Sequence, residues 1–301
     1  MNNENVNLNT EKLLEEYRPN NTKRVKRTII ILIPLLLICV AFLVTLVTVV
    51  IPSQKYKEAK KMYNSNEYEL AYLAYREAGN YKDSETKAEK ILRQYPTVAR
   101  IGDYMILGSY EQDNNMENGK EDIEWQVLEK EGTRFFVVSR YALDVKPYHS
   151  TEEPITWADC SLRQWLNNDF LNSAFNSTEQ DKILWTQVKN NDNMEYKTNG
   201  GRDTEDRVFL LSLDEVNRYF SEEKERQCIV TTYANEDHVS GEGCFWWLRT
   251  SGFKPVGVYE DFCDSDCAVN IFPHGKIDEM GCPVEDTDGN YVRPAMWIDL
   301  E

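Results

Sequence analysis

Two cysteines four positions apart have the spacing in this chain that comes nearest to a reactive site. Cys263 and Cys267 stand in the stretch CDSDC. Such a pair could close to a disulfide, bind a soft metal ion or take part in redox chemistry. A zinc site would need more ligands, and the spacing of the nearby His274 and Cys282 departs from the usual Cys-x-x-Cys pairs. We therefore favour a disulfide or simple thiols here, and we expect no metal and no cofactor.

A second candidate site combines aromatic and basic side chains. The stretch FWWLRTSG, residues 245–252, is expected to contain a strand, in which neighbouring side chains point to opposite faces. Trp247 and Arg249 then share one face, and Trp246 lies on the other, in the core. Together with Arg293 of the stretch YVRPAMW, Trp247 and Arg249 could form a shallow ligand site. The alternative, which we favour, is that these side chains hold the sheet together.

Motifs of common enzyme classes are absent from the sequence. The three histidines lie outside any hydrolase or metalloprotease pattern, and no glycine-rich phosphate loop follows a predicted strand. The stretch EDTDGN, residues 285–290, does not fit a helix–loop–helix calcium site, because counting from Asp286 places Tyr291 at the sixth position, where glycine is needed. A turn is the better interpretation, and catalysis is not expected.

The charge of the C-terminal part excludes one class of partner. Residues 96–301 contain 19 Lys and Arg against 40 Asp and Glu, a net charge of −21, whereas the whole chain has a net charge of −17. A domain this acidic is repelled by the phosphates of nucleic acids. We therefore expect no nucleic-acid partner.

One segment is apolar enough to cross a membrane. Residues 28–51 carry no charge, and a bilayer core of roughly 30 Å needs about 20 such residues in a helix. The sequence thus predicts a transmembrane helix at residues 28–52 that contacts the lipid bilayer. The basic cluster KRVKR before it indicates that residues 1–27 form a polar cytoplasmic tail. The prediction is a single-pass protein of the cell membrane, with its C-terminal domain extracellular.

An exported domain can hold disulfides. The anchor contains Cys39, and an even number of cysteines remains for the domain, which permits up to three bridges whose connectivity the sequence does not decide. These cysteines are Cys160, Cys228, Cys244, Cys263, Cys267 and Cys282.

Residues 53–96 have the pattern of short amphipathic helices. Apolar residues recur at helical spacing, for example at Leu70, Ala71, Ala74 and Tyr75, and Pro96 ends the last helix. The stretch YNSNEYELAYLAYREAGNYKDS resembles a tetratricopeptide-like unit. Such repeats usually need neighbours to bury their faces. A helical stalk is therefore favoured over a peptide-binding array.

Residues 97–301 have the sequence pattern of short strands and turns, with some helices. The stretches IEWQVL and TRFFVVS, separated by a turn, predict a β-hairpin. Helix starts are predicted from three capping boxes, and RVFLLS is expected to be a short buried strand. The boxes are Ser161 with Gln164, Ser177 with Gln180, and Ser212 with Glu215. The expected class is α+β with an irregular antiparallel sheet.

Six blocks in this region carry a resemblance. GSYEQ, IEWQVLEKEGTRFFVVSRYALDVKPYH, SLRQWLNNDFLNSAF, TEDRVFLLSLDEVNRYF, WWLRTSG and VRPAMWI occur in an order that resembles a bacterial domain-of-unknown-function family found behind membrane anchors. The architecture of that family resembles the C-type-lectin-like fold, which formylglycine-generating enzymes share. The resemblance implies a C-type-lectin-like domain and leaves the activity open.

The functional expectation is a membrane protein that displays an acidic extracellular binding domain for an unknown protein or glycan. One alternative, implied by the resemblance, is a formylglycine-generating-type oxidase that uses Cys263 and Cys267, although their spacing differs from the copper-binding pair of such oxidases. A second alternative is recruitment of a peptide or protein by the helical unit.

Overall fold

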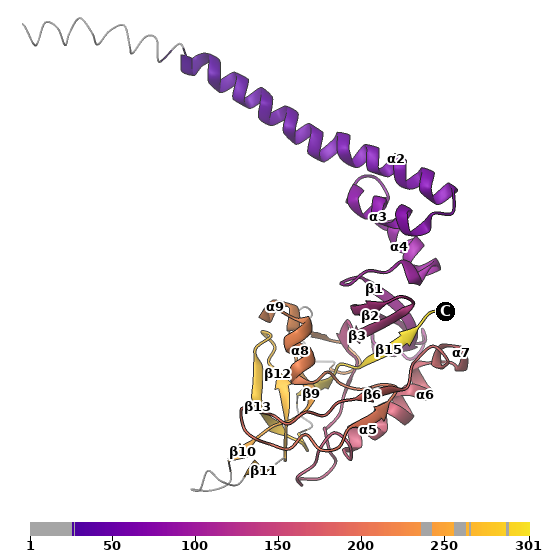
Figure 1. Cartoon of the computed structure of the whole chain (residues 1–301), viewed down its shortest axis with the longest axis vertical. Helices are drawn as coiled ribbons and strands as arrows, with labels where there is room; N and C mark the ends of the chain where they lie inside the picture. The colour runs from indigo at the N-terminus through magenta and orange to yellow at the C-terminus, as the bar shows by residue number, and fades with distance from the viewer. Residues whose placement is uncertain (1–25, 27, 236–242, 256–262, 265, 287–288) are drawn as a thin grey trace, which may run out of the picture. The chain divides into compact units, whose positions relative to one another are not determined.

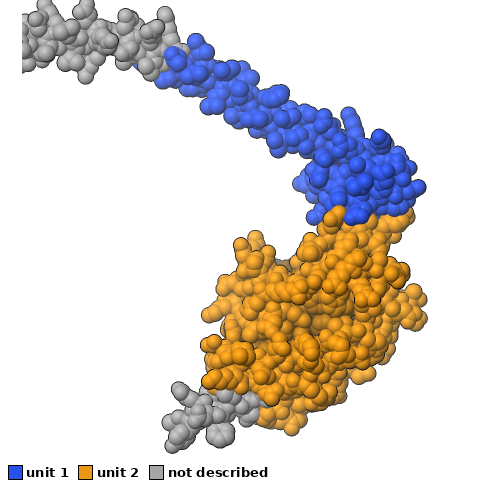
Figure 2. All heavy atoms as spheres, in the orientation of Figure 1, with its two compact units in different colours: residues 1–91 blue, residues 92–301 orange. Residues whose placement is uncertain are grey.

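The chain forms two compact units. The computed structural model describes residues 26, 28–235, 243–255, 263–264, 266–286 and 289–301. Contacts divide the chain into residues 1–91 and 92–301, which Figure 2 colours separately. Except for residue 26, the expected tail at residues 1–27 lies outside the described residues.

A single long helix, Thr28–Asn64, begins the first unit (Figure 1). It contains a π-helical turn, η1 (Leu46–Val50), and ends with α2 (Ile51–Asn64). The helix is long and apolar enough to cross a membrane, and none of its apolar window is buried, although a signal sequence near an N-terminus has the same character. Because the helix runs past residue 52, the predicted anchor and the first stalk helix are one continuous element.

Two shorter helices complete the helical unit, α3 (Tyr68–Ala78) and α4 (Ser84–Gln94). Ala71, Ala74 and Tyr75 of the predicted apolar stripe are buried, but Leu70 is exposed and Tyr72 is buried instead. The ring of Tyr56 on α2 packs edge-on against Tyr75, with 5.6 Å between ring centroids. A second contact of this kind joins Tyr56 to Tyr81, with 5.8 Å between ring centroids, so that Tyr56 links α2 to α3 and to the segment between α3 and α4.

The second unit contains a four-stranded antiparallel sheet in the order β1-β2-β3-β15. Its β2 and β3 form the predicted hairpin, and Ile123, Trp125 and Val127 alternate on its buried face. The strands are β1 (Tyr104–Tyr110), β2 (Glu121–Glu131), β3 (Arg134–Ser139) and β15 (Ala295–Asp299).

A five-stranded sheet has the order β13-β12-β9-β14-β5, and Figure 1 shows β9, β12 and β13 side by side. Its pairs are antiparallel except β14 with β9, which is parallel. The final stretch YVRPAMWIDL forms two strands, because Arg293 and Pro294 interrupt it and send β14 and β15 into different sheets. The strands are β5 (Asp144–Val145), β9 (Phe245–Ser251), β12 (Cys267–Ile271), β13 (Ile277–Pro283) and β14 (Asn290–Val292).

Three two-stranded pairs complete the strands. They are β4 (Tyr141–Ala142) with β8 (Ile229–Val230), β6 (Thr186–Val188) with β7 (Thr204–Asp206), and β10 (Lys254–Pro255) with β11 (Cys263–Asp264). The predicted strand RVFLLS is buried but makes only an isolated bridge, between Phe209 and Ala295. The expected short strand is thus reduced to one bridge, in which Phe209 and Ala295 exchange backbone hydrogen bonds at 2.9 Å and 2.7 Å.

The helices of the second unit are short. They are η2 (Pro96–Val98), α5 (Ser161–Trp165), η3 (Leu166–Phe170), α6 (Leu171–Ala174), α7 (Ser177–Gln180), α8 (Leu213–Tyr219) and α9 (Glu223–Arg226). The capping box of Ser212 with Glu215 is confirmed at the start of α8. The other two helices begin differently, because Cys160 caps α5 and Asn176 with Glu179 caps α7. The second unit is therefore of the α+β class with mainly antiparallel sheets.

Candidate functional site

Both tryptophans of FWWLRTSG lie in the core of the second unit. β9 has neighbouring strands on both sides and is covered on both faces, so Trp246 and Trp247 are both fully buried. Each indole Nε1 donates a hydrogen bond at 3.0 Å to a backbone carbonyl, from Trp246 to Arg226 and from Trp247 to Lys146. The predicted core position of Trp246 is confirmed. Trp247 has no exposed face to offer a ligand.

Arg249 is buried beside a carboxylate. Its guanidinium contacts Glu215 through two nitrogens, at 2.5 Å and 2.9 Å, and its Nη1 also donates to the carbonyl of Leu210 at 2.6 Å. The side chain of Arg249 is 3 % exposed and that of Glu215 is 26 % exposed. The two-point geometry fixes the guanidinium plane and joins β9 to the start of α8.

Arg293 lies in a different part of the interior. Its Nε donates to the carbonyl of Ser139 at 3.0 Å, and the guanidinium stacks on the ring of Trp246 at 4.9 Å from the centroid. The residue is 2 % exposed. Trp247, Arg249 and Arg293 thus share no exposed surface, because the sheet is covered on both faces. The structure does not bring the three side chains to one common surface, and their role in ligand binding stays a prediction.

Arg249 does, however, border a cavity of about 230 Å³. The cavity lies among the loop at residues 189–200, the start of α8, the end of β9 and Glu279 of β13. Asn193 fastens the loop, because its Nδ2 donates to the carbonyls of Ser251 at 3.2 Å and Glu279 at 3.1 Å. This volume would hold one compact group, such as a single long side chain.

The loop closes tightly around a glycine. A Cβ at Gly200 would lie 2.3 Å from the carbonyl oxygen of Asn190 and 2.4 Å from that of Asn191. The Gly200 amide donates to Asp192 Oδ1 at 2.9 Å, which holds that carboxylate at the cavity wall. Any larger residue at position 200 would therefore displace the wall.

Acidic side chains dominate the cavity wall. The two cations at the cavity already have partners, Arg249 with Glu215 and Lys189 with Asp203. Four carboxylates remain, and none is in an ion pair with another residue of the described ranges: Asp192, Glu195, Asp214 and Glu279. Asn190 Oδ1 is buried at the same wall and has no hydrogen-bond partner there. The arrangement favours a ligand that is cationic and donates hydrogen bonds.

Sequence reasoning missed this cavity. Its signal was the run KNNDNMEYKTNGG at residues 189–201, a polar loop without periodicity. Loops of this kind, positioned by rigid elements, often carry binding residues. Only Arg249 of the cavity wall was among the predicted site residues.

Of the predicted cysteine pair, only Cys267 has a side chain among the described residues. Cys267 begins β12 and is 4 % exposed, whereas Cys263 belongs to β11 and its side chain lies outside the described residues. The oxidase alternative therefore stays a prediction. The stretch EDTDGN also lies partly outside, because residues 287–288 are not described.

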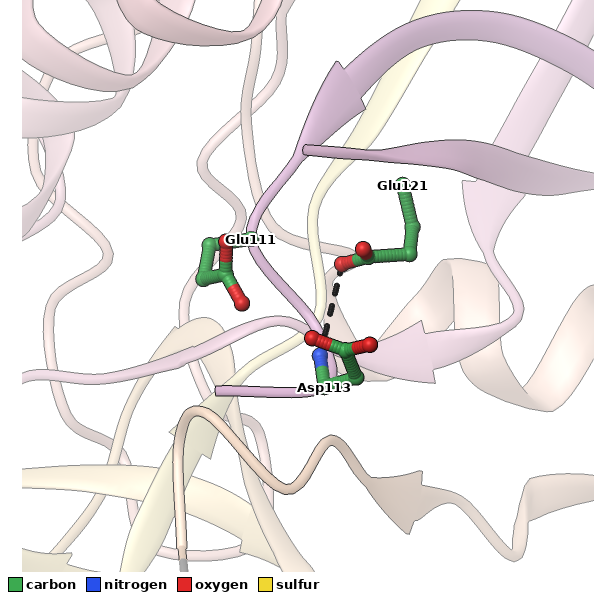
Figure 3. Close-up of side chains that lie close together, drawn as sticks. All are labelled: Glu111, Asp113 and Glu121. Atoms are coloured by element: carbon green, nitrogen blue, oxygen red, sulfur yellow. Dashed lines mark hydrogen bonds between the residues drawn. The ribbon is translucent and has the colours of Figure 1, made fainter. Parts of the chain in front are cut away.

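Three carboxylates come together at the end of β1. One oxygen each of Glu111, Asp113 and Glu121 lie within 4.8 Å of one another, and Figure 3 shows the hydrogen bond from the Asp113 amide to Glu121, at 3.3 Å. Oxygen ligands in such a group can hold a divalent cation. Clusters of this kind also occur on acidic surfaces without an ion, and nothing else among the described residues points to one here.

Comparison with known proteins identifies the region but not its activity. A family model described as "Domain of unknown function (DUF6273)" matches residues 132–300, which contain β9, α8 and the whole cavity wall. No curated protein and no solved structure matches the chain.

Proposed function

The chain belongs to the DUF6273 family, a domain of unknown function, and from this premise we propose that it displays that domain outside the cell as an acidic binding module on a single membrane anchor. The apolar helix Thr28–Asn64 supports the anchor. The basic residues before it, among them Lys23 and Arg24, support a cytoplasmic N-terminus. No catalytic activity is part of this proposal.

The cavity beside Arg249 is the observation that carries the binding role. Four carboxylates without a cation partner among the described residues surround a volume of about 230 Å³. A lysine or arginine side chain fits that size and supplies the missing positive charge and hydrogen-bond donors. We favour a basic segment of an extracellular protein over a glycan, because a neutral sugar offers no positive charge to these carboxylates.

A pair of matched peptides tests the cavity. The full chain in detergent micelles would be titrated calorimetrically with acetyl-Gly-Lys-Gly-amide and with the same peptide carrying Gln in place of Lys. We expect the lysine peptide alone to bind, with an affinity that falls as salt is added. Asp214→Asn and Glu279→Gln should each weaken binding about tenfold, and Asp169→Asn, an exposed carboxylate away from the cavity, should not. Equal binding of both peptides, or of neither, would refute the proposal.

Topology is tested separately on intact cells. Protease added outside should remove the C-terminal unit from a chain tagged at its C-terminus, while a cytoplasmic marker protein stays intact. Degradation only after the cells are opened would place the domain inside.

For the fold, we propose the C-type-lectin-like architecture. The support is the α+β class of the domain, its irregular five-stranded sheet, and Arg293 just before the closing strand β15. A backbone comparison of an experimental structure with lectin-like domains would test it.

The helical unit remains a second candidate, because it has a cavity of its own. A volume of about 240 Å³ is lined by Tyr63, Tyr75, Ile91, Lys60, Lys87 and Lys90. Lysines around an apolar floor favour an acidic peptide segment. The double variant Lys60→Glu/Lys90→Glu of the full chain should abolish binding of a fluorescent Glu-rich peptide there, whereas unchanged binding would exclude this cavity.

A further inference from the structure

Two buried cysteines face each other where β8 approaches β9. The Cys244 amide donates to the Cys228 carbonyl at 2.8 Å, next to an antiparallel bridge between Ile229 and Gly243. Both side chains are buried, at 2 % and 3 % exposure for Cys228 and Cys244, and each thiol affects the ionisation of the other. The Cys228 thiol also donates to the carbonyls of Arg140 at 3.7 Å and Ile229 at 3.6 Å. Residues opposed in this way have Cα atoms about 5.5 Å apart, a separation that a disulfide spans.

A buried cation accompanies the thiols. The guanidinium of Arg293 is almost fully buried, and its Nη1 has no hydrogen-bond partner among the described groups. An isolated positive charge in the interior is costly, and a nearby thiolate offsets that cost. The charge of Arg293 acts on both cysteines.

The two thiols are not equivalent. Burial raises the pKa of Cys228, but the hydrogen bond from Cys244 and the charge of Arg293 outweigh it, and the net pKa lies below the usual value. The hydrogen bond with Cys228, together with burial, raises the pKa of Cys244. The charge of Arg293 therefore favours the thiolate form within this pair.

We propose that Cys228 and Cys244 are a dithiol pair that closes to an intramolecular disulfide by exchange with a disulfide oxidant. One thiol of the pair loses its proton to solvent, and the thiolate attacks one sulfur of the oxidant, whose S–S bond breaks and releases a first thiolate. That thiolate takes the proton of the other cysteine, whose sulfur then attacks the mixed disulfide and displaces the second half of the oxidant as a thiolate, which takes a proton from solvent. Two cysteine thiols are oxidised, and the oxidant is reduced to two thiols.

Two other described cysteines have different roles. Cys160 accepts the Arg163 amide at 3.4 Å as the cap of α5. Cys282 accepts Asn270 Nδ2 at 3.1 Å. The pairing of β12 with β13 places Cys267 opposite Pro283 and Cys282 opposite Ala268, whereas Cys228 and Cys244 lie opposite each other, and this favours their bridge.

The bridge would restrain the unfolded chain. It closes a loop over residues 229–243, and a loop of about 15 residues lowers the entropy of the unfolded state enough to raise Tm by roughly 5–10 °C in a domain of this size. Because both sulfurs are buried, exchange needs a local opening and should be slower than at an exposed thiol.

Mass mapping of the full chain tests the pair. The purified, reduced protein in detergent would be equilibrated with glutathione disulfide and glutathione, blocked with N-ethylmaleimide and digested. We expect a peptide linked through Cys228 and Cys244 as the main oxidised species, and a higher Tm for the oxidised protein. Glutathione adducts alone, bridges to other cysteines, or fully blocked thiols would each overturn the proposal.

Variants then separate chemistry from folding. Cys228→Ser and Cys244→Ser should each abolish the redox dependence of Tm, and the matched buried variant Cys160→Ser should keep it. Arg293→Met should shift the pH profile of oxidation upward, and Arg293→Lys should restore it. If the serine variants do not fold, the presence or absence of the linked peptide in the unmutated chain still shows whether Cys228 and Cys244 form the bridge. This test does not depend on topology, so its failure is distinct from failure of the proposed function.

Discussion

The carboxylate of Glu215 binds the guanidinium of Arg249 across the boundary between α8 and β9, with both oxygens engaged. The same carboxylate accepts the Ser212 amide at 2.9 Å and so completes the capping box of α8. One side chain thereby joins a helix start to the central strand of a sheet, at the wall of the acidic cavity.

Breaking this pair from one side should be costly. Glu215→Leu leaves the Arg249 guanidinium buried without its counter-ion, and we expect a loss of about 3–5 kcal/mol in the free energy of unfolding. The double variant Arg249→Met/Glu215→Leu should lose clearly less than the sum of the two single variants. Urea unfolding of the four proteins measures the coupling.

The exposed pair of Arg140 with Glu124, at 42 % and 35 % side-chain exposure, provides the control. Its coupling should be below about 1 kcal/mol. Additive losses at Arg249 and Glu215 would show that the pair does not act as a unit.

A second prediction concerns the start of α7, where two capping-box sequence patterns overlap and the structure uses one of them. Asn176→Ala should cost about 1 kcal/mol, since the Asn176 side chain accepts the Glu179 amide at 3.0 Å. Ser177→Ala, which removes the cap expected from the sequence, should change stability by less than about 0.5 kcal/mol. Thermal unfolding of both variants shows which residue caps α7. A larger loss of stability for Ser177→Ala than for Asn176→Ala would mean that Ser177 is the cap.

Local signals of this kind predicted much of the fold but not its details. The stretch FNSTEQ contains both Asn176-x-x-Glu179 and Ser177-x-x-Gln180, and only the path of the chain into the helix selects the first. The hairpin of β2 and β3 and the strand β9 were predicted, because alternation and turn residues act over a few positions. The sequence patterns did not predict that β14 and β15, which Arg293 and Pro294 separate, belong to different sheets.

The candidate site depended on contacts that sequence patterns do not contain. Period-two alternation predicts which side of β9 Trp247 occupies, and the sequence alone leaves that side a possible surface. The elements that cover it come from elsewhere in the chain, so Trp247 is buried. The partner of Arg249 lies 34 positions away in sequence. Asn193 reaches Ser251 and Glu279 over still longer separations. Tertiary packing alone decides such pairs.

A third prediction concerns the irregular pairing of β12 and β13. The register shifts between Ala268 and Asn270, and Gly281 opposite has φ +77°, where a Cβ would lie 2.0 Å from the Ala268 carbonyl oxygen. Gly281→Ala should cost about 2–4 kcal/mol through backbone strain and overpacking.

Gly289→Ala serves as the matched control, because a Cβ there would have no heavy atom within 4 Å. It should change stability by less than about 0.5 kcal/mol. Urea unfolding compares the two variants, and equal losses would show that the bulge does not depend on a glycine.

A fourth prediction concerns alkaline pH. The Tyr110 hydroxyl donates to Asp144 Oδ2 at 2.6 Å, and burial, then the hydrogen bond and charge of Asp144, raise the pKa of Tyr110 well above its usual value. A tyrosine that is harder to ionise in the folded state contributes stability that is complete below its unfolded pKa of about 10. That stability is lost as the pH rises above 10 toward the folded pKa, by at most about 1.4 kcal/mol per pH unit.

Urea unfolding between pH 8 and 11 measures this slope. Tyr110→Phe removes the ionisable hydroxyl, so its free energy of unfolding should fall less steeply above pH 10 than that of the unmutated chain. Tyr104→Phe, on the same strand but at a position 40 % exposed, is the matched control and should keep the original slope. Because Lys ionisation affects all three proteins alike, only the difference in slope reports Tyr110. Parallel curves for the unmutated chain and Tyr110→Phe would mean that the Asp144 contact does not control ionisation.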